Sequence, residues 1–389
     1  MTTRGRVLVA GGGIGGLATA VSLRKQGFDA VVFERAERLS EIGAAIGVQT
    51  NAVRALREIG AVDEVLRVGV PIEHYRYYSW RGRRLVDWPQ GDIGRGIGEP
   101  TVVVHRAQLQ RALLDALPAE SVRLGRIVTG YREHPDGGSL EFADGTEEKG
   151  DLVVGADGNR SVLREGLLGP AEPRYSGWIA LRGIAPSFSH PSFPLGVARQ
   201  TLGRGLTFGV WHISDGRVYW VATAAVPAGL RDEPGAGRKA WILDRFRSAH
   251  EPVAELIEAT PAEVILRNDI CDRPPVESWS GRRLTLVGDA AHPTTPVTGQ
   301  GGGQAIIDAH VLGTALGGTA ELDDASLADA FARYQSRRAP VTASITQEAW
   351  RIGAMHHFGN PLLCAGRDLS LRFTPARVWR QRMESRLAF

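Results

Sequence analysis

Short apolar runs that stop at glycine recur along the chain and set its expected architecture. The first run, residues 6–10, is aliphatic and β-branched, and helical spacing of apolar residues follows it up to Gly27. A second apolar run, residues 30–33, ends on Glu34. This order predicts a strand, a helix and a second strand, the βαβ unit from which parallel α/β sheets are built.

The loop after the first strand carries glycines at a spacing that suits a dinucleotide. In the pattern GxGxxG, Gly11 allows a tight turn, Gly13 lets backbone approach a pyrophosphate, and Gly16 lets helix pack on strand. The helix that begins near Ile14 favours phosphate charge at its N-terminus, and Glu34 can accept from a ribose hydroxyl. The pattern indicates a dinucleotide and leaves both FAD and NAD open.

Two later apolar runs also break into loops that carry charged residues. Residues 152–154 lead to Asp157 and Arg164, and residues 284–287 lead to Asp289. A buried acid at a strand end needs hydrogen-bonding partners, which the hydroxyl groups of a ligand can supply.

The three loops resemble the fingerprints of the class A, single-component flavoprotein monooxygenases of the para-hydroxybenzoate hydroxylase type. Residues 11–16, 155–164 and 288–301 match GxGxxG, GADGxxSxxR and GDAAHxxxPxxGQG in that order. Within this family the chain is most similar to salicylate and 3-hydroxybenzoate hydroxylases, FAD-dependent urate hydroxylase and zeaxanthin epoxidase, over about residues 5–345.

The resemblance implies an α/β fold with a Rossmann-like FAD-binding domain of the GR2 type, an interposed mixed β-sheet substrate domain and a C-terminal helical segment. We expect a discontinuous FAD-binding domain at 1–70, 101–169 and 276–345, a substrate domain at 71–100 and 170–275, and a helical tail at 346–389.

The resemblance also assigns residues to the cofactor. Asp289 would bind the ribityl chain, Arg106 the phosphate and ribose, and the helix start after Pro296 would stabilise negative charge on the reduced flavin. A plain surface arginine at 106 and a structural contact between Asp157 and Arg164 are the alternatives. The cofactor-binding set is Gly11, Gly13, Ile14, Gly16, Glu34, Arg35, Arg106, Asp157, Arg164, Asp289, Pro296, Gly299, Gly301, Gly302 and Gly303.

By the same resemblance, NADH or NADPH reduces FAD, and O2 forms a flavin C4a-hydroperoxide that hydroxylates or epoxidises an aromatic or polycyclic small molecule. The protein would supply a dry pocket, substrate placement and sometimes a base. Two alternatives stay open: an FAD-dependent oxidase or reductase without oxygen insertion, and a Rossmann-type NAD(P)-dependent dehydrogenase. The Trp-x-Trp-x-Ile-Pro motif of flavin halogenases does not occur in the sequence.

A predicted aromatic hairpin, residues 206–213 and 217–223, supplies the pocket candidates. His212 is the candidate base because histidine titrates near neutrality, with a structural histidine beside a turn as the alternative. The catalytic candidates are His212, Pro296 and Gly301, and the candidate substrate contacts are Trp178, Arg182, Arg204, His212 and Trp220.

Composition then excludes several classes of protein. The chain has 46 basic and 43 acidic residues, and residues 351–389 hold seven arginines against two acidic residues. The rest of the chain therefore has no excess of positive charge that would attract nucleic acid. Two cysteines and the lack of any long apolar stretch argue against a disulfide framework, a metal site and a membrane span.

We therefore expect a cytoplasmic enzyme, monomeric or homodimeric, with an aromatic substrate, O2 and NAD(P)H as partners. Residues 361–364 and 378–387 could form an amphipathic tail that caps the pocket or pairs subunits, with contact to an anionic membrane as the alternative.

Overall fold

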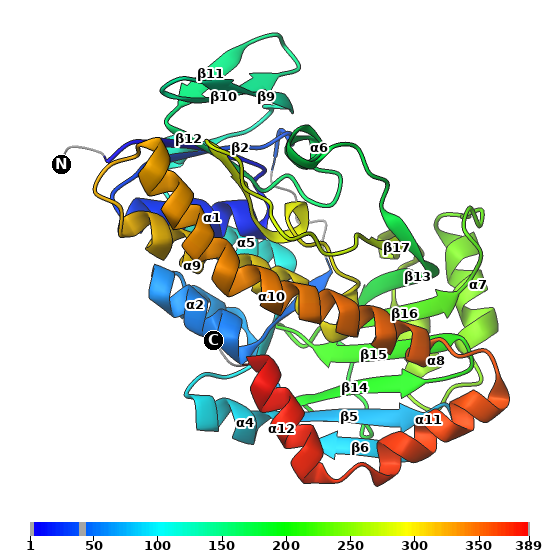
Figure 1. Ribbon diagram of the computed structural model, residues 1–389. Helices are drawn as coiled ribbons and strands as arrows, with labels where there is room; N and C mark the ends of the chain where they lie inside the picture. The colour runs from blue at the N-terminus through cyan, green and yellow to red at the C-terminus, as the bar shows by residue number, and fades with distance from the viewer. Residues whose placement is uncertain (1–3, 39–43, 388–389) are drawn as a thin grey trace.

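A parallel sheet of five strands forms the centre of the computed structural model, which describes residues 4–38 and 44–387 (Figure 1). The strand order is β18-β12-β1-β2-β8, and every neighbouring pair is parallel. The strands are β1 (Arg6–Ala10), β2 (Asp29–Phe33), β8 (Val122–Arg123), β12 (Leu152–Gly155) and β18 (Leu284–Leu286). Because β1 and β12 are covered on both faces, they are almost wholly apolar.

Helices cover one face of this sheet, and a small antiparallel sheet lies over the other side in Figure 1. The helices here are α1 (Ile14–Lys25), α2 (Thr50–Ile59), α3 (Asp63–Val68), α5 (Arg106–Asp115) and α9 (Gly301–Gly317), whereas α6 (Val162–Leu168) contacts the small antiparallel sheet. The small sheet contains β9 (Val128–His134), β10 (Gly137–Phe142) and β11 (Glu147–Gly150), and a third sheet contains β3 (Ala45–Val48), β4 (Val70–Pro71) and β7 (Val102–His105).

A seven-stranded mixed sheet forms the other half of the molecule, with the order β17-β13-β16-β15-β14-β5-β6. Its strands are β5 (His74–Ser79), β6 (Arg84–Trp88), β13 (Arg174–Ala185), β14 (Val197–Leu202), β15 (Leu206–His212), β16 (Val218–Ala225) and β17 (Leu266–Asp272). Helices α7 (Ala236–Phe246) and α8 (Val253–Ala259) pack on one face of this sheet and bury an apolar core with it. The opposite face looks towards the parallel-sheet half.

Strand alternation decides which side chains reach each face of the mixed sheet. On β15, Phe208 and Val210 join the core under α7 and α8, while Thr207 and Trp211 point the other way. Strand β16 pairs with β15 in antiparallel register, with Thr207 opposite Thr223. The two strands therefore present matched side chains towards the space between the two halves.

Three C-terminal helices complete the fold (Figure 1): α10 (Asp324–His356), α11 (Pro361–Phe373) and α12 (Ala376–Leu387). Helix α10 has 33 residues and is thus about 50 Å long, so it runs from the parallel sheet to the mixed sheet. Leu371 of α11 and Met383 and Leu387 of α12 pack in a cluster with β6 and with α4 (Gln90–Ile97). Within 4–38 and 44–387, the helices are all too short or too polar to cross a bilayer.

Candidate active site

A cavity of about 1120 Å³ lies between the two halves of the molecule. At one end it is lined by the glycine loop after β1, by Glu34 and by Arg106. At the other end it is lined by the open face of the mixed sheet and by Met383 of α12. The loop after β18 and the start of α9 lie between these ends.

The three glycines of the GxGxxG pattern, Gly11, Gly13 and Gly16, occupy three different environments. Gly11 has a φ of +105°, and a Cβ there would collide with the carbonyl of Ala156 on the neighbouring loop. A Cβ on Gly16 would collide with the carbonyl of Gly11, so this glycine lets α1 pack against β1. Gly13 faces the cavity with no atom within 4 Å of a built Cβ. The loop therefore leaves bare backbone and free space where a pyrophosphate would lie.

Glu34 directly follows β2 and lines the cavity. Its carboxylate accepts from the backbone N–H of Gly12 at 2.6 Å and from that of Ala36 at 2.9 Å. The amide of Gln110 donates to the carbonyl of Gly12 at 2.8 Å. These bonds hold the glycine loop and the carboxylate in a fixed relation. Arg35 also lines this part of the cavity.

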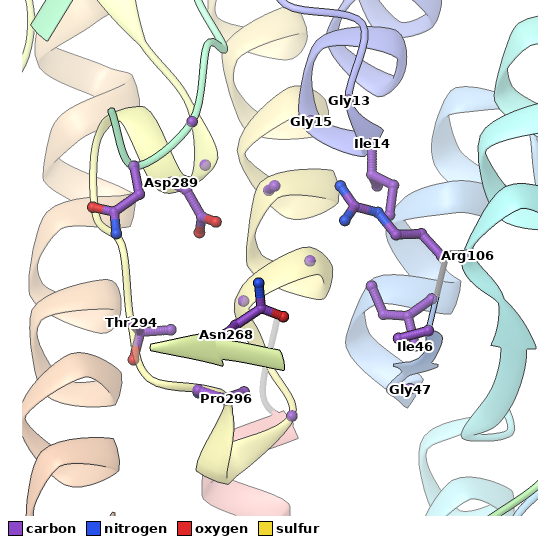
Figure 2. Close-up of a pocket in the computed structure, with 18 of the residues that line it drawn as sticks. Gly13, Ile14, Gly15, Ile46, Gly47, Arg106, Asn268, Asp289, Thr294 and Pro296 are labelled. Atoms are coloured by element: carbon purple, nitrogen blue, oxygen red, sulfur yellow. The ribbon is translucent and has the colours of Figure 1, made fainter. Parts of the chain in front are cut away.

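Arg106 is the first residue of α5, and its side chain extends towards Ile14 at the start of α1 (Figure 2). It lines the cavity with an exposed side chain. The guanidinium and the N-terminus of α1 thus place positive charge at the same point, which suits an anionic phosphate.

Asp157 in the loop after β12 has an unsatisfied oxygen. Its Oδ2 accepts from the backbone N–H of Leu163 at 3.3 Å, whereas its Oδ1 is buried with no partner among residues 4–38 and 44–387. Burial raises the pKa of this carboxyl group. The hydroxyls of Thr294 and Thr298 are also buried and unpaired within the same described ranges, and all three residues line the cavity. Such orphaned groups are costly unless a ligand pairs with them.

Asp289, after β18, extends into the cavity, where burial raises the pKa of its carboxyl group (Figure 2). Arg164 is buried beside this loop and does not line the cavity. Its Nη1 donates to the carbonyls of Ala290 and Ala291 at 2.8 and 2.6 Å. Arg164 therefore holds the loop that positions Asp289.

A buried ion network, which the sequence analysis missed, fixes the same loop to α9 and α10. Asp308 accepts from the backbone N–H of Gly288 at 2.9 Å, from Nε2–H of His292 at 2.6 Å and from Nε–H of Arg338 at 2.7 Å. Burial alone would raise the pKa of Asp308, but His292 and Arg338 outweigh it and lower the pKa below its usual range. The signal in the sequence is the pairing of an aspartate on α9 with a histidine in the third fingerprint.

The start of α9 opens onto the centre of the cavity. Pro296, Gly299, Gly301 and Gly302 line it, while Gly303 packs against Ala52 of α2. The first backbone N–H groups of a helix have no partner inside the helix. At this position they put partial positive charge at the cavity wall, which would stabilise negative charge on a reduced flavin ring held there.

The candidate substrate contacts separate into two groups. Trp178 and Arg182 of β13 line the cavity. Trp220 lies in the core under α7 and α8, where its Nε1–H donates to the hydroxyl of Thr260 at 2.8 Å. Arg204 is exposed and donates to the carbonyl of Gly359.

His212 also lies outside this cavity. Its ring stacks on Phe193 with centroids 4.1 Å apart, and its Nε2–H donates to the carbonyl of Phe193 at 3.1 Å. Burial lowers the pKa of His212. The ring therefore has a structural partner and no direct access to the cavity.

Several cavity residues were not singled out from the sequence. They belong to the inward-facing positions of the mixed sheet and to the C-terminal helices, and alternation along each strand is the signal that identifies them. They include Tyr75, Tyr77, Trp88, Gln200, Thr207, Trp211, Tyr219, Thr223, His357 and Met383.

The geometry fits FAD. The free space at Gly13 suits the pyrophosphate, Glu34 suits a ribose, the unpaired oxygen of Asp157 suits a hydroxyl, and the α9 start suits a flavin ring. Bound FAD supplies the redox chemistry, taking electrons from NADH or NADPH and passing them to O2. The residues named above would bind and orient it.

Comparison with known proteins agrees with this geometry. Residues 4–349 match the FAD binding domain family. The chain is 40% identical to an aurachin C monooxygenase/isomerase of Stigmatella aurantiaca, over 96% of this chain and 95% of that protein. It is 36% identical to a 3-amino-4-hydroxybenzoate 2-monooxygenase of Streptomyces cremeus, over 95% and 92% of the two chains.

A solved structure is similar over the same extent. Klebsiella pneumoniae HpxO, crystallised with FAD and uric acid, superposes with a TM-score of 0.92 at 30% identity and covers 98% of this chain and 96% of its own. Family match, relatives and fold agree with the three fingerprints and set aside the dehydrogenase alternative. The chain belongs to the FAD binding domain family and is an FAD-dependent monooxygenase of the single-component flavoprotein class.

Proposed function

We propose that this chain uses NADH or NADPH and O2 to hydroxylate or epoxidise a flat aromatic or polycyclic small molecule. The observation that carries the proposal is the continuity of the cavity, which joins the FAD-binding loops to an aromatic wall. That wall is made by Tyr75, Tyr77, Trp88, Trp178, Trp211 and Tyr219.

The shape of the aromatic wall supports a planar substrate. The rings of Tyr75 and Trp88 stack with centroids 5.0 Å apart and planes inclined by 12°. The rings of Trp211 and Tyr219 lie 5.7 Å apart. Flat ligand rings gain from contact with such faces, beyond the area they bury.

Polar groups among these rings support a substrate that carries a hydroxyl or ring N–H. Gln200, Thr207 and Thr223 face the cavity beside the aromatic side chains. The relatives act on or bind molecules of this kind: 3-amino-4-hydroxybenzoate for the Streptomyces cremeus enzyme and uric acid for Klebsiella pneumoniae HpxO. A few placed polar groups in an apolar pocket set the orientation of a ligand.

The proposal divides the work between the two halves. The loops around Gly13, Glu34, Asp157 and Asp289 would hold FAD, and the mixed sheet would place the substrate ring over it. A cytoplasmic location is part of the proposal, because the reaction consumes NAD(P)H and both cysteines are unpaired.

The decisive experiment measures oxygen incorporation. The holoenzyme is mixed with NADH or NADPH and one of four compounds, 3-amino-4-hydroxybenzoate, urate, 4-hydroxybenzoate or 4-hydroxyquinoline, under labelled O2. We expect at least one compound to stimulate NAD(P)H oxidation and to gain one labelled oxygen atom. Peroxide release with no labelled product from any compound would favour an oxidase and refute the proposal.

A matched pair of variants tests the location of the substrate. Trp211→Ala removes part of the aromatic wall, so the relative rates for the four compounds should change. Arg204→Ala removes an exposed side chain outside the cavity, so those relative rates should stay as in the wild type. If the two variants behaved alike, the substrate would not lie on this face of the sheet.

A further inference from the structure

We propose that Thr207, Thr223 and His357 form a proton relay that accepts the proton of a substrate hydroxyl or ring N–H. The inference rests on the proposed function and assigns the base of that reaction. All three residues line the cavity, on β15, on β16 and just after α10.

The three side chains form a continuous hydrogen-bonded chain. The hydroxyls of Thr207 and Thr223, directly opposite each other on paired strands, lie 2.7 Å apart. The Thr223 hydroxyl lies 2.8 Å from Nε2 of His357. The other ring nitrogen of His357, Nδ1, lies 2.8 Å from the carbonyl oxygen of Gly353.

The carbonyl of Gly353 fixes the direction of every bond in this chain. A carbonyl oxygen can only accept, so Nδ1 of His357 carries the proton and Nε2 of the neutral ring is an acceptor. The Thr223 hydroxyl must then donate to Nε2, and its oxygen accepts from the hydroxyl of Thr207. The oxygen of Thr207 is left with acceptor capacity at the cavity wall, where it can accept from a substrate O–H or N–H.

Proton transfer along this chain is balanced and needs no further reactant. The substrate proton moves to Thr207, the hydroxyl proton of Thr207 moves to Thr223, and that of Thr223 moves to Nε2 of His357. The substrate O–H or N–H bond breaks and a new N–H bond forms on Nε2 of His357. No atom is oxidised or reduced. The same path returns the proton when the product hydroxyl forms again.

The surroundings keep His357 rigid and neutral until a substrate binds. Trp178 of β13 stacks on its ring with centroids 4.6 Å apart and planes inclined by 16°. Burial, with repulsion from Arg367 of α11, lowers the pKa of His357 to about 4, and the adjacent His356 is also held neutral, with a pKa lowered to about 3. The substrate anion left beside Thr207 would attract the imidazolium formed on His357, and this attraction favours the transfer.

His212, the base suggested by the sequence, lies on the opposite face of β15 from Thr207. Its Nε2–H is already bound to the carbonyl of Phe193. The geometry therefore favours His357 for the role, and His212 provides the comparison variant.

The first test measures the tautomer of His357 in the holoenzyme. Nitrogen-15 histidine spectra of the wild type and of His357→Gln identify the resonances of this ring by difference. We expect a neutral ring with its proton on Nδ1 from pH 6 to 8. A neutral ring with its proton on Nε2 would reverse the chain and overturn the relay.

The second test measures the pH profile of hydroxylation, with the compound among the four above that is turned over fastest. Thr223→Val removes the hydroxyl at nearly constant volume and should slow oxygen incorporation at pH 7 by about 100-fold or more. The rate should recover as the pH approaches the pKa of the compound in water, because the substrate then arrives ionised. His357→Gln should behave in the same way.

Two further variants separate proton transfer from packing. Thr223→Ser keeps the hydroxyl and should keep the wild-type profile, as should His212→Gln. Product formation by Thr223→Val at the wild-type rate and with the wild-type pH profile overturns the relay alone. Failure of the wild type to oxygenate any of the four compounds overturns the proposed function instead.

Discussion

Replacing Gly13 by alanine separates cofactor binding from folding. A Cβ at this position meets no atom within 4 Å, and its φ of −71° and ψ of 179° suit any residue. Alanine restricts the unfolded chain more than glycine does, which stabilises the folded protein by roughly 0.4–1 kcal/mol. Alanine is also a poorer helix N-cap than glycine, which costs a similar amount. The free energy of unfolding of the FAD-free variant should therefore stay within about 1 kcal/mol of the wild type.

The binding of FAD should respond very differently to the same methyl group. If the pyrophosphate lies against the backbone of Gly13, the methyl overpacks that contact at a cost of about 1–3 kcal/mol. The Kd for FAD then rises about 5-fold to 150-fold. At an FAD concentration of about 100 times the wild-type Kd, the ligand stabilisation would fall from roughly 2.7 kcal/mol to roughly 0.3–1.8 kcal/mol.

Thermal unfolding with and without FAD, together with a titration that follows flavin fluorescence, measures both quantities. Gly16→Ala is the contrasting variant: its Cβ collides with the carbonyl of Gly11, so it should destabilise the protein even without FAD. A Gly13→Ala protein that bound FAD with the wild-type Kd would show that the pyrophosphate does not approach this residue, and the reasoning would fail.

The loop after β18 gives three further predictions. Asp308→Ala leaves the guanidinium of Arg338 buried without its carboxylate, so urea unfolding at pH 7 should show a loss of about 3–5 kcal/mol, and a loss below 1 kcal/mol would contradict this. Because folding lowers the pKa of Asp308, its carboxylate stabilises the folded protein fully above the unfolded pKa of about 3.9, and this stabilisation is lost as the pH falls towards the folded pKa. In Asp308→Asn, the free energy of unfolding should therefore fall less steeply as the pH is lowered into the acid range. Arg164→Met frees the carbonyls of Ala290 and Ala291 and should weaken FAD binding by about 1–3 kcal/mol in fluorescence titrations, with an unchanged Kd as the contrary result.

The FAD-binding half could be predicted closely because its glycines determine local backbone. The strand expected at 6–10 is β1, and the apolar run at 152–154 lies in β12, which ends at Gly155. In each case a run of apolar residues stops at a glycine, and a Cβ added at these glycines would collide with a neighbour or enter the ligand space. Such constraints act over a few residues, so they remain visible in the sequence.

The substrate half was harder to predict because both faces of its sheet are buried. The hairpin expected at 206–213 and 217–223 is β15 and β16, with the end of β16 at Ala225. Its strands do not alternate cleanly between apolar and polar, since one face packs on α7 and α8 and the other carries Thr207 beside Trp211. Alternation puts His212 on the same face as Phe208 and Val210, but the sequence alone did not reveal that this face packs on α7 and α8 and not on the cavity.

The relay could not be found from sequence spacing at all, because Thr223 and His357 are 134 residues apart. Their contact depends on the length and direction of α10. Arg338 in this helix binds Asp308 beside the flavin loop, and His357 follows its last residue at the mixed sheet. The two positions are 19 residues apart and therefore separated by about 28 Å along the helix axis.

One helix thus sets the position of the base relative to the cofactor. A residue inserted in α10 between Arg338 and Gly353 would turn His357 by about 100° around the axis and shift it by about 1.5 Å. The bond between Arg338 and Asp308 would persist, while Nε2 of His357 would no longer face Thr223. The bond between Arg338 and Asp308 fixes the loop after β18, and the bond between His357 and Thr223 fixes the end of α10 to the mixed sheet. The length of α10 therefore sets the distance between these two parts of the site.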